Sequence, residues 1–543
     1  MSHLVPPETV IPSALTPIEN HEDSAKGSCE EISEFAVADS VIDDEPVVTR
    51  KELWSYYLYH NGDNGTGPFN YTLTIFQALA HKAGYDPAKG PENSCSPTGQ
   101  CVLPWAGGVK SVSSIILIAQ GVSFAIMTLL FTTVGSMADY GRSGRWVLLV
   151  FTVLCWAAQF ATISLTQPDR WGLAMMMYII GFTTFGATLV FYTAIFPRLA
   201  RNTPHARSLR EKLRRGDITA EEYELEDSME TNRISNLSTT HNYIGKVVTL
   251  GLNLSILLPL AGNPKVNNYT LLLTSGYWVL LGIWWFVFQQ LRPGSPLPKG
   301  AHYVTIGWKQ IWVALQQYRQ LPYTFTFLAG VFLLADVSTS LGAVEQGWNT
   351  TLNLVLICQN DTFQFSLLQN TYLSLVDGVA SVISTLGFGY VQRYWKISAK
   401  RMYAMTNIVM ILLPLLGVVG LRSSKFGYHN VWEYWVYHVI SGLFIGPSYA
   451  FAQTIMAELT PPGYNNMFFG LYGLPTSSAS LIGPNIVQAI IDKSGNNWEG
   501  FPFLLALSTC ASLIIWFGVD VSKGKRDAAA WAVKRRSNIQ GGI

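Results

Sequence analysis

Charged residues are scarce in this sequence, and their scarcity excludes whole classes of protein. Asp, Glu, Lys and Arg make up only 13% of the 543 residues, whereas a soluble domain carries about a quarter. The formal net charge is +1, so the chain lacks the positive excess that nucleic-acid binding requires, and we expect no nucleic-acid partner. Aromatic residues are plentiful instead, with 17 Trp, 25 Tyr and 27 Phe, which is typical of a protein surrounded largely by lipid.

The sequence patterns of common catalytic and metal sites are also missing. The nine His residues form no His-Glu-x-x-His pattern, and the six Cys residues form no Cys-x-x-Cys pair. Neither a Gly-x-x-x-x-Gly-Lys-Ser/Thr phosphate loop nor a Gly-x-Ser-x-Gly nucleophile turn is present. We therefore expect no enzyme activity, no cofactor, no metal and no ATP-driven pumping.

Long apolar segments recur along almost the whole chain. A membrane helix needs about 20 mostly apolar residues, and twelve segments approach that requirement. They are 54–79, 111–134, 146–166, 171–196, 243–261, 271–291, 323–344, 366–391, 402–421, 431–456, 467–490 and 501–520. The sequence therefore predicts an all-α polytopic membrane protein with about twelve transmembrane helices in two six-helix bundles that repeat each other.

Lys and Arg are distributed unevenly between the two sides of these segments. With the N-terminus in the cytosol, the cytosolic segments hold roughly three times as many basic residues as the opposite ones. Both termini are therefore expected in the cytosol. Residues 1–50 hold eleven acidic residues and no apolar run, a composition typical of disorder.

These observations predict a division of the chain. An acidic disordered cytosolic tail covers 1–50, and a first bundle covers 51–291 with a cytosolic loop at 197–242. A cytosolic linker at 292–322 leads to a second bundle at 323–520 and a basic cytosolic tail at 521–543.

Two chemical features fall on the side away from the cytosol. Cys95 and Cys101 lie there in a Pro-, Gly- and Ser-rich loop, where a disulfide could persist, although two unrelated thiols remain an alternative. Glycosylation sequons at Asn268, Asn349 and Asn360 fall on the same side.

The loop between the second and third segments carries the most specific motif. It reads Gly-Ser-Met-Ala-Asp-Tyr-Gly-Arg-Ser-Gly-Arg from Gly135 to Arg145 and resembles the signature loop of the major facilitator superfamily. Gly135 and Gly144 allow close helix packing, and Asp139 can cap a helix or pair with Arg142 or Arg145. We expect a gating contact here; an ordinary polar turn is the alternative.

The first apolar segment contains its own helix breakers. Gly62, Gly65 and Pro68 are expected to break the helix near mid-membrane, where exposed backbone groups suit a zwitterionic amino acid. Asp63 could bind the ammonium group or carry a proton. Alternatively, residues 60–68 form a loop between an interfacial helix and a shorter span.

Charges within later segments point to further sites. Asp336 lies in the seventh segment and Asp377 in the eighth. Because a buried charge in a membrane costs about 2.5–3.5 kcal/mol, such residues usually face a pathway or a partner. Either residue could serve as a proton site or, alternatively, as a structural hydrogen bond between helices.

Several stretches, in the same order, resemble the autophagy-related protein 22 family, the fungal vacuolar amino-acid effluxers of the major facilitator superfamily. They are 52–59, 60–70, 138–141, 191–202 and 332–336. The resemblance covers nearly all of residues 50–525. It implies a multi-pass protein of the vacuolar membrane that releases neutral amino acids, such as leucine, isoleucine and tyrosine, after autophagic breakdown. Protons are a second candidate substrate, because Asp336 or Asp377 could serve as a proton site.

Candidate substrate-binding residues come from these stretches and from the membrane carboxylates. They are Asn61, Asp63, Asn64, Asn70, Tyr192, Asp336 and Asp377. The expected partners are a small amino acid and the lipid bilayer; the oligomeric state stays open. A facilitator for a sugar or a peptide, at the vacuole or the plasma membrane, and a transporter-like sensor are the alternatives.

Overall fold

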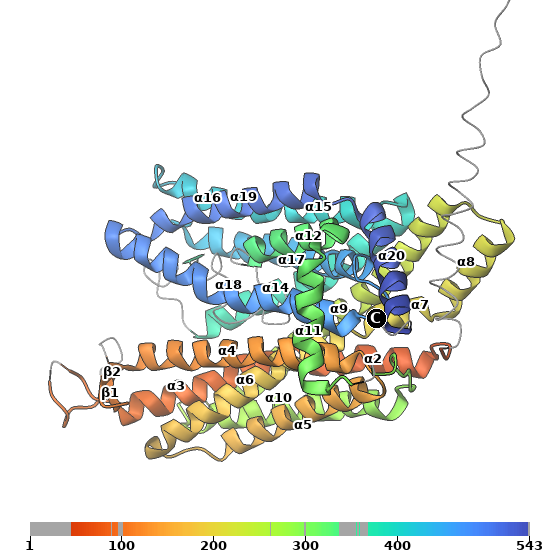
Figure 1. Ribbon diagram of the computed structural model, residues 1–543. Coiled ribbons are helices and arrows are strands. Elements are labelled where there is room, and N and C mark those ends of the chain that lie inside the picture. Colours follow the sequence, from red (N-terminus) through yellow and green to blue (C-terminus); the bar gives the residue numbers. More distant parts are fainter. Residues whose placement is uncertain are drawn as a thin grey trace, which may run out of the picture. The chain divides into compact units, whose positions relative to one another are not determined.

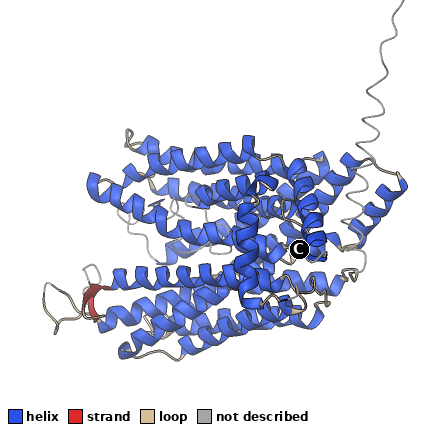
Figure 2. Cartoon of the chain, viewed as in Figure 1, coloured by secondary structure: helices blue, strands red, loops and turns tan. Residues whose placement is uncertain are grey.

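The computed structural model describes residues 45–87, 89–95, 101–260, 262–297, 300–335, 354–355, 358 and 367–540. In these residues the fold is helical apart from a hairpin of β1 (Val102–Trp105) and β2 (Gly108–Ser111), paired antiparallel with Val102 opposite Ser111 (Figure 2). Residues 1–44 of the predicted tail 1–50, and the candidate residue Asp336, lie outside the described residues.

The first half of the described chain contains six spans, the first of them interrupted. Its elements are α2 (Arg50–Gly62), η1 (Thr66–Tyr71), α3 (Thr72–Ala83), α4 (Val112–Ala138), α5 (Ser143–Ile163), α6 (Trp171–Thr193), α9 (Ala220–Leu257) and α10 (Val266–Phe288), with a short η2 (Pro168–Arg170) before α6. The first half thus follows the predicted segments closely.

The second half repeats this arrangement. Its elements are α12 (Pro322–Ala335), α14 (Leu367–Trp395), α15 (Ala399–Asn407), α16 (Val409–Gly420), α17 (Val431–Glu458), α18 (Asn465–Ser494), η4 (Asn497–Gly500) and α19 (Phe501–Gly518). The helices of both halves run side by side in Figure 1, and α4 packs against α18 while α9 packs against α14.

Eight helical segments of the described chain are long and apolar enough to cross a membrane. They are Ser114–Ala138, Ser143–Ile163, Pro168–Arg201, Val266–Phe288, Thr371–Trp395, Ala399–Gly420, Val431–Glu458 and Asn497–Gly518. The remaining predicted segments correspond to the broken first span and to α9, α12 and α18. Large apolar side chains such as Leu280, Ile383 and Phe517 are more than half exposed, as expected of surfaces that face lipid rather than water.

The predicted cytosolic loop 197–242 is wrong as a loop. It contains α7 (Phe196–Arg201), α8 (Pro204–Arg215) and the first part of α9, which begins in a capping box between Thr219 and Glu222. The first part of α9 is polar because it packs against the second half instead of lipid. Hydropathy therefore detected only the later part of this 38-residue helix.

The predicted boundary of the N-terminal tail lies too late in the chain. Glu45 already contacts the bundle, because it forms an ion pair with Arg198 at 2.5 Å and accepts a hydrogen bond from Asn202 Nδ2 at 2.6 Å. The acidic composition of the tail masked this contact, which depends on residues far away in the sequence.

The linker and the C-terminal segment are also helical. The linker 292–322 holds α11 (Tyr303–Gln316) and η3 (Tyr318–Gln320), and α11 runs across the bundle helices in Figure 1. Its Trp308 and Trp312 are at least half exposed, which fits a helix at the membrane interface. The basic segment 521–543 forms α20 (Val521–Gln540), whose buried Trp531 contacts Tyr464 and Phe468 at the start of α18.

The two ends of the bundle are distinguished by what they carry. One end carries β1 and β2 and is called the hairpin end; the other carries α7, α8 and α20 and is called the α20 end (Figure 1). The predicted topology assigns the α20 end to the cytosol.

Candidate substrate site

The first span breaks where the glycines predicted a break. α2 ends at Gly62, Gly65 adopts a left-handed φ of +83°, and the chain resumes as the π-helical η1. A Cβ on Gly62 would lie 2.9 Å from Trp278, which stands at the middle of α10. This depth favours a mid-span break over a loop at the interface.

The side chain of Asn64 holds the break in shape. Its Nδ2 donates to the carbonyl of Asn61 at 3.1 Å, and its Oδ1 accepts from Thr66 Oγ1 at 2.7 Å. Asn61 in turn accepts a hydrogen bond from the Tyr277 hydroxyl through its side-chain oxygen. The candidate residues Asn61 and Asn64 therefore stabilise the helix break through their hydrogen bonds. The side chain of the third candidate, Asn70, lies outside the described residues.

Asp63 lies inside the break, and only one of its two carboxylate oxygens has a hydrogen-bond partner among the described residues. It is 1% exposed, and its Oδ1 lies 2.6 Å from His60 Nδ1. Its Oδ2 has no hydrogen-bond partner among the described residues. Because an unpartnered buried carboxylate oxygen is costly, this atom is the natural place for a cationic group of a ligand.

The candidate residue Tyr192 lies close to this carboxylate. Its ring stacks on Tyr56 with centroids 4.2 Å apart and lies 4.7 Å from the His60 ring. Its hydroxyl lies 2.8 Å from Ser238 Oγ and donates to the Tyr56 carbonyl at 2.9 Å. The second half contributes Tyr449, which lies close enough to Asp63 for an electrostatic interaction. The Tyr449 hydroxyl has no hydrogen-bond partner among the described residues.

We call His60, Asp63, Tyr192, Ser238 and Asn242 the central cluster. Asn242 joins it because its Nδ2 donates to the His60 carbonyl at 3.3 Å. These residues come from α2, α6 and α9, so the cluster forms where three spans of the first half meet. Its mixture of one carboxylate, one imidazole and aromatic faces suits a ligand with a cationic head and an apolar side chain.

A second charged contact lies between the two halves. Lys246 of α9 and Asp377 of α14 form an ion pair at 3.0 Å, with side chains 2% and 11% exposed. The predicted candidate Asp377 thus lies at the boundary of the two halves. Lys246 and His60 were missed by the sequence analysis, although a lysine inside a predicted span and a His three residues before Asp63 were available signals.

The gating motif makes one of the two contacts expected of it, the helix cap. Asp139, immediately after α4, accepts hydrogen bonds from the backbone N–H groups of Asn466 at 2.8 Å and Met467 at 2.9 Å, and from Asn466 Nδ2 at 2.9 Å. It therefore caps the N-terminus of α18 rather than pairing with Arg142 or Arg145. Burial raises the pKa of Asp139 to about 7, although these hydrogen bonds oppose the rise.

The rest of the motif supports this contact. A Cβ on Gly135 would stand 3.4 Å from the Asn466 carbonyl, and one on Gly144 would stand 3.0 Å from the Ala138 carbonyl. Arg145 donates to the Phe286 carbonyl at 2.5 Å and so ties α5 to α10. The close packing that the motif predicted is therefore seen at Gly144, whereas at Gly135 a Cβ would make an ordinary contact.

Further contacts join the halves near the α20 end. Asn232 bonds with Gln392 and accepts from Thr454 Oγ1 at 2.9 Å, and Ser235 Oγ donates to the Ala450 carbonyl at 2.9 Å. Together with Asp139 and Asp227, these residues define what we call the α20-end seam.

At the rim of this seam, Lys525 of α20 pairs with Asp227 at 2.7 Å. Burial raises the pKa of Asp227, but the Lys525 ammonium more than offsets this effect, so the pKa ends below its usual value.

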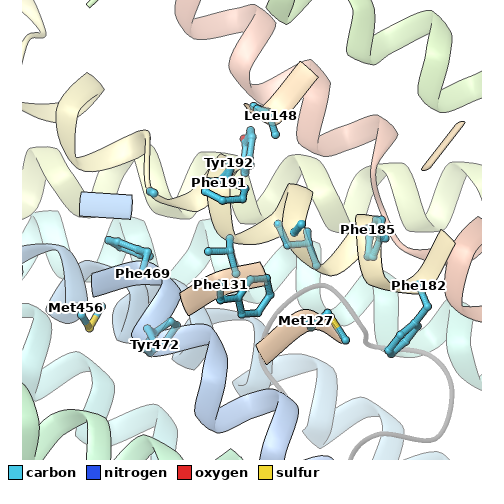
Figure 3. Close-up of a cluster of buried hydrophobic side chains, with 14 of the residues drawn as sticks. Met127, Phe131, Leu148, Phe182, Phe185, Phe191, Tyr192, Met456, Phe469 and Tyr472 are labelled. Atoms are coloured by element: carbon cyan, nitrogen blue, oxygen red, sulfur yellow. The ribbon is translucent and has the colours of Figure 1, made fainter. Parts of the chain in front are cut away.

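Apolar packing closes the same region. Figure 3 shows Phe131 of α4 near Phe469 and Tyr472 of α18, with Met456 of α17 on the same side. All four side chains are buried. The seam therefore combines polar contacts with a core-like apolar interface between the two halves.

The predicted features of the hairpin end have different outcomes. Cys95 and Cys101 form a disulfide, as predicted; His81 lies beside them, but bonded sulfurs offer no thiolate to a metal. Asn268 is buried, and its Nδ2 donates to the carbonyls of Ile163 and Leu165. This geometry disfavours a glycan there, whereas Asn349 and Asn360 lie outside the described residues.

Comparison with known proteins identifies the family. Residues 48–529 match the family described as "Vacuole effluxer Atg22 like". The chain belongs to this family. It is 24% identical to "Autophagy-related protein 22" of Gibberella zeae, over 89% of this chain and 81% of that protein, and 26% identical to "Autophagy-related protein 22-1" of Penicillium rubens, over 80% of each.

Solved structures confirm the fold of this Atg22-like chain. The proton:xylose symporter XylE matches with a TM-score of 0.56 and 10% identity, over 93% of this chain and all of that one. The human organic anion transporter MFSD10 matches with a TM-score of 0.53 and 13% identity, over 86% of this chain and 98% of that one. The predicted family and the major facilitator fold of two six-helix bundles are confirmed, and the protein is a multi-pass vacuolar transporter.

Proposed function

We propose that this transporter exports neutral amino acids of the leucine, isoleucine and tyrosine type from the vacuole to the cytosol by alternating access. The observation that carries the proposal is the Asp63 carboxylate, which is buried at a helix break with one oxygen unpartnered. An α-ammonium group supplies the missing donor. The aromatic faces of Tyr56 and Tyr192 beside it suit an apolar or aromatic side chain.

The contacts between the halves support a particular stage of the cycle. The seam at the α20 end is held by hydrogen bonds, ion pairs and apolar packing. With that end facing the cytosol, as the distribution of basic residues predicts, the cytosolic side is shut in this state. Substrate then reaches the central cluster from the lumen and leaves when the seam opens.

His60 and Asp63 suit a second role in the same step. A proton shared between them changes the charge that faces the substrate, because imidazole and carboxylate are 2.6 Å apart in a buried site. Coupling to the acidic lumen would pass through this pair. The other membrane carboxylates proposed from the sequence, Asp336 and Asp377, remain candidates for the same purpose.

Flux measurements on vacuolar vesicles test the proposal. Vesicles loaded with labelled leucine should release it faster with the protein than without, and labelled glucose should leave at the same rate in both. Glucose release that depends on the protein would favour the sugar-carrier alternative, and absence of any dependent flux would favour a sensor. A protein tagged at either terminus should place that tag on the cytosolic side in a protease-protection assay.

A further inference from the structure

A buried ion pair crosses the boundary between the two halves of this protein. Lys246 Nζ lies 3.0 Å from Asp377 Oδ2, and both side chains are nearly inaccessible. One charge belongs to α9 of the first half, and the other belongs to α14 of the second half. Any movement that separates these helices must therefore pull apart two charges in a region of low dielectric constant.

The pair stands at a crowded junction of four segments. Glycines next to the charged residues make the crowding possible, because a Cβ on Gly245 would stand 1.9 Å from the Asn61 carbonyl and one on Gly378 would stand 2.8 Å from Val247. A Cβ on Gly442 of α17 would stand 2.4 Å from the Asp377 carbonyl. The helix break, α9, α14 and α17 thus meet at this point.

Polar groups of α9 and α17 surround the pair. Tyr243 and Tyr437 lie close enough to Asp377 for an electrostatic interaction with its carboxylate. His438 interacts electrostatically with both members of the pair. The Nε2 atom of His438 has no hydrogen-bond partner in the described part of the chain. The junction therefore keeps unused hydrogen-bonding capacity beside its two charges, which a purely structural ion pair does not need.

We infer that Lys246 and Asp377 form the subsite that recognises the zwitterionic head of the substrate. When the halves separate at this level, Lys246 binds the α-carboxylate, and Asp377 shares the three N–H donors of the α-ammonium with Asp63. The substrate thus takes the place of each charge of the broken ion pair. This inference rests on the proposed function and extends it, because it names what the carrier requires of a substrate: both charges on one carbon.

The subsite also explains why an empty carrier would not cycle freely. Without substrate, separation of the halves breaks the attraction between these two buried charges, which is strongly unfavourable. With a zwitterion in place, each charge keeps a partner throughout the movement. Leucine lacking either its carboxylate (3-methylbutylamine) or its amine (4-methylpentanoate) satisfies only one of the two groups.

Thermal unfolding of the purified full-length protein in detergent tests this inference. Leucine should raise the melting temperature of the wild-type protein, whereas 3-methylbutylamine and 4-methylpentanoate should not. In Asp377→Asn the order of the ligands by the rise in melting temperature should change, so that 4-methylpentanoate stabilises the protein more than leucine does. In Lys246→Met, 3-methylbutylamine should stabilise more than leucine. A merely structural ion pair would not produce these opposite shifts in preference.

A double variant protects the test against misfolding of the single variants. Lys246→Met combined with Asp377→Leu removes both charges, and such apolar replacements of buried pairs usually preserve folding. Its melting temperature without ligand should stay near that of the wild type, and its affinity for leucine should fall at least roughly a hundredfold. Wild-type leucine affinity in the double variant overturns the inference, as does an unchanged ligand order in both single variants.

The wild-type protein separates this result from the proposed function. Leucine-dependent stabilisation and flux in the wild type, together with normal leucine binding by the double variant, would leave amino-acid export standing and remove only the subsite. Absence of leucine binding by the wild type would remove the export proposal itself and the subsite with it.

Discussion

Asp63 and Asp139 are both buried carboxylates of the first half, yet their surroundings differ. Asp139 accepts three hydrogen bonds from the start of α18, so both its oxygens are partnered. Asp63 has one oxygen beside His60 and another with no partner among the described residues. The difference indicates that a satisfied carboxylate can hold two halves together, whereas a half-satisfied one is available to a ligand.

The largest effect is expected at the unsatisfied carboxylate. Asp63→Asn removes the charge that binds the substrate ammonium, and losing one partner of a buried charge pair costs about 3 kcal/mol, or somewhat more than a hundredfold in affinity. Leucine affinity, measured by thermal stabilisation over a concentration series, should fall by that factor. The seam should stay shut. An unchanged leucine affinity would take Asp63 out of the substrate site.

The second effect is expected at Asp139, whose oxygens are both hydrogen-bonded. A substitution there should change the opening of the seam rather than the affinity for leucine. Asp139→Leu leaves backbone N–H groups of α18 without an acceptor, at a cost to the closed seam of about 2 kcal/mol, or roughly thirtyfold in opening. The readout is the labelling rate of Ser235→Cys by a bulky thiol reagent, in a chain whose cysteines other than Cys95 and Cys101 are replaced by Ala. Equal labelling with and without Asp139→Leu would contradict the capping role.

The third effect concerns pH, and we assign it to Asp139. Burial raises the pKa of Asp139 to about 7 in the closed seam, whereas an exposed Asp titrates near 4. Closing therefore takes up a proton, so the closed seam is favoured at low pH and loses stability as pH rises through about 7. Labelling at Ser235→Cys should rise roughly tenfold from pH 6 to pH 8 beyond the intrinsic reactivity of the thiol.

The matched control for this pH effect is Asp139→Asn, which keeps an acceptor oxygen and cannot titrate. Its labelling should depend on pH only as much as that of a free thiol does. A tenfold rise that persists in Asp139→Asn would assign the pH dependence to another group.

The smallest effect is expected from the partner of Asp139. Asn466→Ala removes one side-chain donor and leaves the two backbone donors of α18 in place. The closed seam should lose about 1 kcal/mol, or roughly fivefold in labelling rate. Combined with Asp139→Leu, Asn466→Ala should have almost no further effect, since both variants break the same contact. Additive effects would show that Asn466 acts elsewhere.

Much of the fold could be predicted from the sequence because its determinants are local. Apolar segments of sufficient length mark helices wherever they face lipid, so most predicted boundaries agree with the structure. The break at Gly62 and Gly65 followed from glycine and proline chemistry. The disulfide between Cys95 and Cys101 followed from their place in one loop on the side away from the cytosol.

What could not be predicted depends on contacts between distant residues. Asp139 and Asn466 are 327 positions apart, and nearby arginines offered a simpler partner. The first part of α9 is too polar for a hydropathy criterion, because its environment is the other half of the protein. Lys246 has the same explanation: its partner Asp377 belongs to the second half, and no local pattern relates the two.

The length of α9 has a mechanical consequence. At 38 residues, this helix is about 57 Å long, and it carries Asp227, Asn232 and Ser235 toward one end and Lys246 further along. If it moves as a rigid lever, a tilt of about ten degrees around its middle displaces each end by about 5 Å in opposite directions. The movement of this one helix would then loosen contacts at one end of the transporter while tightening those at the other. The two ends would therefore not be open at the same time.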